Sequence, residues 1–203
     1  MAGQKQHVDL HRKLLLRKAL LRRASEGAVY VPFCGDGDIA AALYIDRPIY
    51  AADLDPKRVE VCRERLSGAI IESADCDQWP FPGIERPFAV ADFDAYVHPY
   101  ASFLTFWTEA LKARRMALFF TDGHRQGIAR AGVLYRPDGT RECLTGIVER
   151  RRVYNFYWTR VVEPWFRGVV AGWRVLRLMR YLRGAGMLYW GALIERSDES
   201  LGG

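Results

Sequence analysis

The sequence predicts an α/β fold whose core is a doubly wound, mostly parallel sheet of seven strands with an antiparallel hairpin at its C-terminal end. Short β-branched segments alternate with helical segments over the first two thirds of the chain. A glycine-rich turn follows the first strand, and an apolar hairpin pattern ends the chain. Such spacing is typical of βαβ units with right-handed connections. Since 203 residues suffice for one good-sized core, we expect a single domain over residues 1–203.

The predicted elements begin with a basic helix. Asp9 is placed to cap a helix over residues 10–24, and Gly27 ends it. Asp55 and Pro56 suit the N-cap and N1 positions of a later helix that continues to residue 66. The other predicted helices cover residues 39–44 and 102–113, and the predicted strands cover residues 28–33, 49–52, 69–72, 88–93 and 116–121.

Turn and helix-breaking residues divide the C-terminal third. The run Arg-Pro-Asp-Gly at 136–139 predicts a turn, and Pro164 interrupts a helical pattern over residues 153–170. Residues 173–194 predict two strands that turn at 184–186, although arginine at every third position there fits neither a strand nor a helix period. The domain thus divides into a basic N-terminal helix at 1–27, a core at 28–123, and a C-terminal part at 124–203 with a basic segment and the final hairpin.

Composition argues against several classes of protein. No apolar run approaches the ~20 residues of a membrane-spanning helix, and Arg17 and Lys18 interrupt the leucines at 14–16 that would form a signal-peptide core. The four cysteines and four histidines are scattered without metal-ligand spacing, which indicates reduced thiols and no metal site. We expect a cytoplasmic protein without a membrane partner. The oligomeric state cannot be inferred from these patterns.

The net charge of +6 is distributed unevenly along the chain. Residues 1–23 hold seven Lys/Arg and one acid, and residues 149–183 hold nine Arg and two Glu. Between them, residues 24–148 hold 13 basic and 18 acidic side chains. Basic segments on both sides of an acidic middle indicate a surface for a polyanion such as nucleic acid. The alternative is that these basic residues only solvate exposed faces.

The glycine turn after the first strand predicts a cofactor site. Residues 35–40 read GDGDIA, which satisfies the dinucleotide pattern G-x-G-x-x-G/A, and Asp53 ends the second strand where a ribose-binding acid would lie. A diphosphate on this turn would meet Asp36 and Asp38, at a cost on the order of 1–4 kcal/mol. S-adenosylmethionine has no phosphate, and acidic side chains attract its cationic sulfonium and amino groups. The turn therefore favours S-adenosylmethionine over a nicotinamide or flavin dinucleotide.

The order of the motifs resembles that of the class I S-adenosylmethionine-dependent methyltransferases. The run FCGDG at 33–37 follows the first strand, YAADLDP at 50–56 includes the end of the second, and SADC at 73–76 follows the third. The resemblance implies a Rossmann-like methyltransferase fold in which residues 28–123 form the cofactor-binding core. In that family the acid after strand two holds the ribose hydroxyls, and the acid after strand three binds the adenine amino group.

Carried onto this sequence, the family pattern implies a cofactor site with one departure. Pro32 stands where the family often has an acid, so recognition of the methionine amine falls to Asp36 or a backbone carbonyl. The ribose role falls to Asp53 and the adenine role to Asp75. The implied cofactor-binding residues are Phe33, Gly35, Asp36, Gly37, Asp53, Leu54, Asp75, Cys76 and Asp92.

The segment after the fourth strand carries the substrate prediction. Residues 92–103 read DFDAYVHPYASF, which resembles the D-[IL]-D-P-[FY]-G-[ST]-P-x-x-F motif of tRNA guanine-N2 dimethyltransferases. The run FTDG at 120–123 is similar to their motif after strand five. Ala95 and Val97 depart from the motif, so a related group of RNA or DNA methylases is the safer comparison. A second register, matched to x-P-P-[YF], moves the aromatic platform to Tyr100.

The expected chemistry is methylation of a base amine, whose lone pair is delocalised into the ring. Asp94 or a backbone carbonyl can accept its N–H and compensate the developing positive charge, while Tyr96 or Tyr100 stacks on the base. Alternatively, the aromatic residues form a tight turn under the sheet. The implied catalytic residues are Asp92, Asp94, Tyr96, Pro99 and Tyr100.

We expect an S-adenosylmethionine-dependent methyltransferase that acts on nucleic acid, RNA rather than DNA, with tRNA as the first candidate. The alternatives are a DNA base-amine methyltransferase, a non-catalytic nucleic-acid-binding module on the same fold, and a small-molecule methyltransferase. Tyr154, Tyr157 and Trp158 lie among the arginines of the basic segment. They either stack on splayed bases or form the core of a helix that packs on the sheet.

Overall fold

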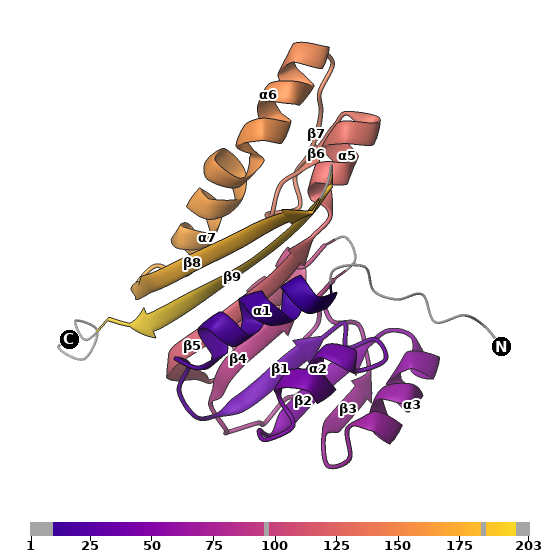
Figure 1. Cartoon of the computed structure of the whole chain (residues 1–203), viewed down its shortest axis with the longest axis vertical. Helices are drawn as coiled ribbons and strands as arrows, with labels where there is room; N and C mark the ends of the chain where they lie inside the picture. Colours follow the sequence, from indigo (N-terminus) through magenta and orange to yellow (C-terminus); the bar gives the residue numbers. More distant parts are fainter. Residues whose placement is uncertain (1–9, 96–97, 184–185, 198–203) are drawn as a thin grey trace.

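A central seven-stranded sheet organises the protein (Figure 1). The computed structural model describes residues 10–95, 98–183 and 186–197, and the structural statements below concern these residues. The strand order is β3-β2-β1-β4-β5-β9-β8. The first five strands in this order are parallel to one another, while β9 pairs antiparallel with both β5 and β8. This order confirms the predicted fold. The strands are β1 (Ala28–Pro32), β2 (Ile49–Asp53), β3 (Ile70–Ser73), β4 (Phe88–Phe93), β5 (Lys112–Asp122), β8 (Trp173–Arg183) and β9 (Met187–Arg196).

Three helices cover one face of the sheet: α1 (Leu10–Leu21), α2 (Asp38–Leu43) and α3 (Pro56–Arg65) (Figure 1). The start of α3 follows the local signals, because the Asp55 side chain accepts a hydrogen bond from the Lys57 N–H and proline occupies the first turn. Leu16 and Leu20 of α1 pack into the core on this face. Helix α1 therefore closes over strands that come much later in the chain, β5 and β9.

The opposite face is packed largely with aromatic side chains beneath α4 (Tyr100–Glu109). Tyr30 of β1 stacks on Phe106 of α4 with ring centroids 5.3 Å apart, and Phe120 of β5 stacks on Trp190 of β9 at 3.9 Å. No helix is described between β3 and β4, and Trp79 from that segment packs edge-on against Tyr30 instead. Buried aromatic rings thus fill a position that a helix would otherwise cover.

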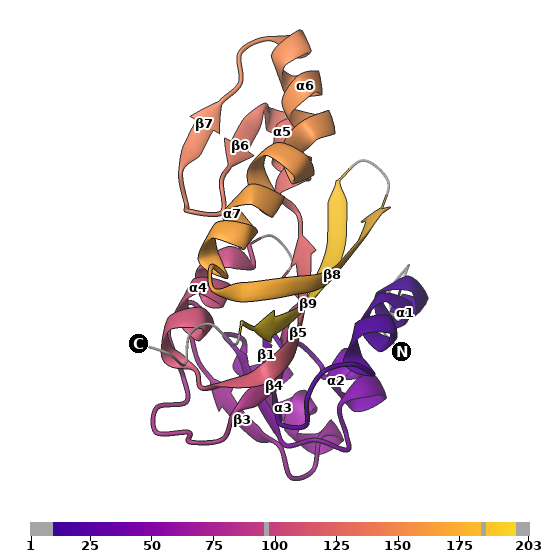
Figure 2. The same cartoon turned by 90° about the vertical axis from the view of Figure 1, so that its left-hand side faces the viewer.

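A second group of elements projects beyond the carboxyl end of β5 (Figure 2). We call residues 123–162 the distal lobe. Helix α7 (Glu163–Val169) then returns the chain from this lobe to the sheet, where Phe166 is buried against Trp190. The lobe consists of α5 (His124–Ala131), β6 (Val133–Tyr135), β7 (Arg141–Cys143), α6 (Ile147–Tyr157) and the π-helical turn η1 (Trp158–Val162).

Several predicted boundaries shift for identifiable physical reasons. The predicted helix over 102–113 is α4, which begins at Tyr100 and ends at Glu109. Residues 111–113 favour helix by propensity, but Lys112 opens β5 and pairs with Phe88, so sheet pairing overrides propensity. The predicted N-terminal helix ends three residues early, at Leu21, and its predicted cap Asp9 lies outside the described residues.

The C-terminal third contains more structure than the sequence pattern predicts. The turn at 136–139 is confirmed and joins β6 to β7, whereas α5 and this hairpin were not expected. The helix predicted over 153–170 begins at Ile147 and is interrupted before Pro164 by η1, in which the Glu163 N–H donates to the Trp158 carbonyl. A bulge between Val175 and Arg177 in β8 accounts for the three-residue interval from Arg174 to Arg177, but the later arginines lie on regular strand and therefore alternate between its two faces. Within the described residues, no helix combines the length and apolar character needed to cross a bilayer.

Candidate functional site

The glycine turn between β1 and α2 is built for close approach by a bound molecule. Gly35 and Gly37 adopt φ angles of 53° and 78°, in the left-handed region that favours glycine. A Cβ atom added at Gly37 would lie 3.0 Å from the Cys62 Sγ atom of α3, so a side chain there would press against that helix. Phe33, at the start of the turn, is the one described non-glycine residue with a positive φ, 58°. The backbone strain is therefore concentrated where the cofactor is predicted to lie.

Asp53 at the end of β2 braces this turn. One carboxylate oxygen accepts the Gly35 N–H at 2.9 Å, and the other accepts the Asp55 N–H at 3.0 Å. A carboxylate offers about four acceptor positions, so roughly two remain for an external donor such as a ribose diol. The neighbouring Leu54 is 72% exposed and its side chain is available to a ligand at the same edge.

The segment after β3 adds two more of the predicted residues. Asp75 is exposed, and its carboxylate accepts the Asp77 N–H at 3.0 Å in a local turn. Cys76 is buried, and its Sγ atom accepts the Phe33 N–H at 3.4 Å, which links this segment to the glycine turn. Burial raises the pKa of Cys76 to about 12, so it remains a thiol. Asp36 is exposed on the glycine turn itself.

Asp92 lies inside the protein, away from this open edge. Its side chain is fully buried, and its two oxygens accept from Nε and Nη2 of Arg17 at 2.6 Å each and from the Tyr44 hydroxyl at 2.7 Å. Burial alone would lower the pKa of Arg17, but the Asp92 charge raises it above its usual value, so Arg17 stays protonated. The carboxylate predicted to contact substrate and cofactor thus joins α1 and the C-cap of α2 to β4.

Asp94, two residues later, reaches the carboxyl end of β4 and is partly exposed. Lys13 of α1 donates to both of its oxygens at 2.7 and 2.9 Å, and the Thr121 hydroxyl donates to one of them. Arg17 lies 3.7 Å away. Burial would raise the pKa of Asp94, but the positive charges of Arg17 and Lys13 outweigh it and hold the pKa below its usual value. Asp94 is therefore an ionised acceptor at neutral pH.

Tyr100, another of the predicted catalytic residues, contacts a second buried carboxylate, Asp122 at the end of β5. Tyr100 is fully buried, and its hydroxyl donates to Asp122, so its ring cannot face a bound base and the structure does not support the stacking role predicted for it. Pro99 is also buried and forms the N-cap of α4. Tyr96, with Val97, lies outside the described residues.

Asp122 ties three segments together. Besides Tyr100, it accepts the Tyr157 hydroxyl of α6 at 3.0 Å and the backbone N–H of His124 at 2.7 Å. The Tyr157 hydroxyl donates to Asp122 and lies 3.1 Å from Nδ1 of the buried His124. Burial raises the pKa of Asp122 to about 6, and burial with the nearby His98 lowers the pKa of His124 to about 3.

These two shifts predict opposite effects of pH on stability. The lowered pKa of His124 makes the folded state lose stability as the pH falls below about 6.5, whereas the raised pKa of Asp122 makes it gain stability as the pH falls below about 6. Replacing His124 by glutamine removes only the first effect. Relative to wild type, the His124→Gln protein should gain about 2 kcal/mol in free energy of unfolding between pH 7 and pH 5, measured by urea denaturation. The exposed His11→Gln variant is the control, and identical pH profiles for wild type and His124→Gln would contradict the assignment.

Sequence reasoning missed the basic partners of the two acids on β4. Arg17 lies next to Leu16 and three positions before Leu20, the two buried leucines of α1. An arginine on the buried stripe of a helix needs a carboxylate partner, and this spacing was the available signal. Lys13 lies one turn earlier on the same stripe. Of the basic-segment aromatics, Tyr157 and Trp158 are buried, so they belong to the core, and Tyr154 is partly buried beneath Arg125.

Comparison with known proteins identifies the fold. Neither family models nor curated proteins match the sequence, but many solved structures match the chain. The N-methyltransferase NodS from Bradyrhizobium japonicum WM9, in complex with S-adenosyl-L-homocysteine, matches with a TM-score of 0.59 and 12% identity over 93% of this chain and 87% of NodS. The magnesium protoporphyrin IX methyltransferase ChlM from Synechocystis PCC 6803, also with bound S-adenosyl-L-homocysteine, gives 0.56 and 13% over 92% and 83%. TrmN from Thermus thermophilus gives 0.51 and 21% over 91% of this chain and 49% of TrmN.

The similarity covers the sheet, its helices and most of the chain in each case. At these identities it establishes that the chain has the fold seen in S-adenosylmethionine-dependent methyltransferases. The named substrates of the similar proteins differ from one another, so the fold does not by itself select an acceptor.

Proposed function

We propose that this protein is an S-adenosylmethionine-dependent methyltransferase that methylates a base amine of nucleic acid, with RNA preferred over DNA. The observation that carries the proposal is Asp94, a partly exposed, ionised carboxylate at the end of β4, one strand away from the glycine turn that follows β1. In a doubly wound sheet, ligands bind at the carboxyl ends of the strands, where these two features meet. We treat residues 1–203 as one domain that contains the whole site.

The residues at this edge fit the cofactor. The glycine turn lets the methionine portion lie against the backbone, and the two remaining acceptor positions of Asp53 suit the ribose hydroxyls. Asp75 is exposed where it can accept from the adenine amino group, with Leu54 and Phe33 beside it. When bound, S-adenosylmethionine supplies an electrophilic methyl group on a sulfonium.

The protein's own contribution to the transfer is orientation and charge. Asp94 accepts an N–H of the target amine, which draws the lone pair out of conjugation and compensates positive charge as the new C–N bond forms. Lys13 and Thr121 fill about three of the four acceptor positions of Asp94, which leaves roughly one for the amine. Asp92 and Arg17 hold β4 and α1 in place beneath this contact. Among the described residues predicted to be catalytic, the partial exposure of Asp94 at the end of β4 supports this role.

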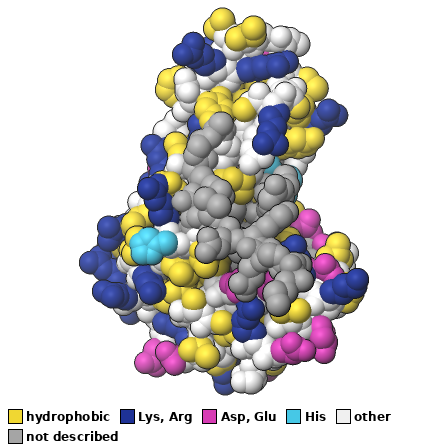
Figure 3. Space-filling view, turned by 45° about the vertical axis from the view of Figure 1, so that its right-hand side comes forward, with side chains coloured by type: hydrophobic (Ala, Val, Ile, Leu, Met, Phe, Trp, Pro, Cys, Tyr) yellow, Lys and Arg dark blue, Asp and Glu magenta, His cyan; other side chains and the backbone are white. Residues whose placement is uncertain are grey.

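The charge distribution supports a polyanionic substrate. Residues 28–122 hold nine Lys/Arg and 15 acidic side chains, whereas the distal lobe holds eight arginines and three acids. Figure 3 shows Lys and Arg side chains over the distal lobe, and on the lower half both acidic and basic side chains. The basic lobe would attract an anionic polymer, and the acidic residues of the cofactor site suit a cationic methyl donor.

The experiment is methyl transfer from labelled S-adenosylmethionine to total RNA and total DNA, followed by nucleoside mass spectrometry. We expect a methylated base amine in RNA. Replacing Asp53 by alanine should weaken cofactor binding, measured by calorimetry, by roughly 100-fold, because it removes charge-assisted hydrogen bonds. The control is Asp46→Ala, an exposed acid in the loop that precedes β2, at the opposite end of that strand.

Three outcomes would contradict the proposal. Transfer to neither polymer by a folded protein would remove the nucleic-acid substrate. RNA binding without affinity for S-adenosylmethionine would identify a non-catalytic binding module. Equal cofactor affinity in the Asp53→Ala and wild-type proteins would place the cofactor elsewhere.

A further inference from the structure

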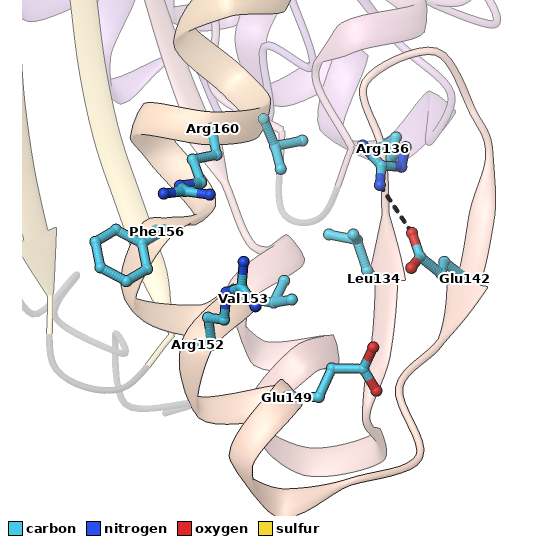
Figure 4. Close-up of a pocket in the computed structure, with 9 residues that line it drawn as sticks. Leu134, Arg136, Glu142, Glu149, Arg152, Val153, Phe156 and Arg160 are labelled. Carbon is cyan, nitrogen blue, oxygen red and sulfur yellow. Dashed lines mark hydrogen bonds and ion pairs between the residues drawn. The ribbon is translucent and has the colours of Figure 1, made fainter.

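We infer that the distal lobe carries a nucleotide-binding groove, separate from the methyl-transfer edge, that holds one unpaired nucleotide of the RNA substrate. The inference rests on the proposed function for the identity of the polymer. The groove is a cavity of about 230 Å³ between α6 with η1 on one side and the β6–β7 hairpin on the other (Figure 4). This volume lies below the usual range for drug-sized ligands, so it suits a single base or nucleotide.

One wall of the groove is a stripe of three residues, Arg152, Phe156 and Arg160. They are spaced four positions apart along α6 and η1, so they share one face of the helix. Phe156 is 46% exposed, which is unusual for a phenylalanine, and the guanidinium of Arg160 lies 5.3 Å from the centre of its ring. An exposed aromatic ring between two arginines provides a stacking surface for a base and cations for the flanking phosphates.

The acidic side chains of the groove are already engaged. Glu142 pairs with Arg136 at 2.8 Å across the β6–β7 hairpin, as the dashed line in Figure 4 marks. Glu149 accepts the Thr145 N–H at 3.2 Å near the start of α6. Neither carboxylate is paired with Arg152 or Arg160, for which the described residues provide no ion pair. The positive charge of the stripe is therefore available to an anion.

Three aliphatic side chains also line the cavity: Leu134 on the hairpin wall, and Val153 and Val161 on the helix wall. The hairpin wall carries the Arg136–Glu142 ion pair as well. Aliphatic and aromatic side chains beside unpaired arginines match the chemistry of a nucleotide, whose base is apolar on its faces and whose phosphate is anionic. A stretch of duplex would present only phosphates to this groove and would not use Phe156, so the geometry favours a single-stranded segment.

The test measures binding of a fluorescein-labelled single-stranded RNA dodecamer to the full chain by anisotropy, over a range of salt concentrations. Phe156→Ala should weaken binding about tenfold, as expected for the loss of one stacked base. The double variant Arg152→Ala/Arg160→Ala should weaken binding and reduce the slope of log affinity against log salt by about 1.4. The matched control is Arg141→Ala, which removes one exposed lobe charge on β7 outside the groove and should leave the Phe156-dependent binding intact. Circular dichroism melting checks that each variant is folded.

Methyl transfer separates this inference from the proposed function. If the groove holds substrate, the variants raise KM for RNA while kcat and cofactor affinity stay at wild-type values. Wild-type RNA binding and KM in both the Phe156 variant and the arginine variant would overturn the groove and leave the methyltransferase proposal standing. Binding that depends on the stripe in a protein that transfers no methyl group would support the groove and overturn the proposed activity. A loss of RNA affinity in Arg141→Ala equal to that in the groove variants would show that lobe charge alone binds RNA, and would overturn the groove.

Discussion

Replacing Arg17 by methionine is expected to lower the free energy of unfolding by about 3–5 kcal/mol, because Asp92 would then be a buried carboxylate without its cation. The Tyr44 hydroxyl would remain as a donor, but a neutral donor does not replace a bidentate guanidinium. Urea denaturation at pH 7 measures the effect as a shift in midpoint at constant slope.

The matched control is Lys18→Met, which removes one positive charge from the adjacent, exposed position of α1. Its free energy of unfolding should stay within about 0.5 kcal/mol of wild type. A double variant, Arg17→Met/Asp92→Leu, removes both charges and should recover part of the loss, since no unpaired ion remains. If Arg17→Met were as stable as Lys18→Met, the ion pair would not be the link between α1 and β4.

Replacing Asp94 by asparagine is expected to lower kcat for methyl transfer by about 10²–10³-fold, the cost typical of losing one electrostatic contact to the transition state. Asparagine keeps the shape of the side chain but loses the negative charge that compensates the amine as it becomes cationic. The affinity for S-adenosylmethionine should stay unchanged, because the glycine turn and Asp53 do not contact Asp94. Single-turnover kinetics with saturating RNA measures the chemical step.

The control for Asp94 is Thr121→Val, which removes one hydroxyl donor to the carboxylate and leaves its charge and the Lys13 contact in place. This variant should lose far less activity than Asp94→Asn. Unchanged kcat in Asp94→Asn, together with normal cofactor binding, would move the amine acceptor to a backbone carbonyl, the alternative that the sequence left open. Equal losses in both variants would indicate that the local geometry, and not the charge, matters.

The central sheet could be predicted because its signals are local. A β-branched, apolar run predicted β1, an apolar run predicted β4, and the Asp55–Pro56 pair predicted the start of α3, since capping and proline effects act within one turn. The end of α4 and the start of β5 depend on pairing between Phe88 and Lys112, which are 24 positions apart, so propensity alone misplaced them. The π-helical turn includes Trp158, which packs against Trp190 of β9. Local sequence patterns carry no information on this contact and did not predict the turn.

The candidate site shows the same difference between residues located by local signals and residues located by long-range contacts. Gly35, Gly37 and Asp53 could be located from the sequence because the turn chemistry and the strand end fix them. The sequence pattern did not distinguish Asp92 from Asp94, because residues two positions apart on a strand point to the same face of the sheet. The two carboxylates differ in how deeply they are buried. Their different roles depend on Arg17 and Lys13, which come from a helix some 75 positions earlier. The stripe at 152, 156 and 160 was visible in the spacing but requires the cavity to distinguish it from a solvated face.

The hydrogen bonds of Asp122 bear on which nucleotide of a bound RNA strand would be methylated. Through Tyr100 and Tyr157 this carboxylate joins the start of α4 to the end of α6, the helix that carries Phe156. These hydrogen bonds fasten the base of the lobe to the sheet. If an RNA strand binds both in the groove and at Asp94, as we propose, a fixed spacing between the two places would set the methylated position at a fixed number of nucleotides from the one in the groove. Inserting one nucleotide into the RNA between the nucleotide in the groove and the methylated nucleotide should change which nucleotide is methylated, while the same nucleotide stays in the groove.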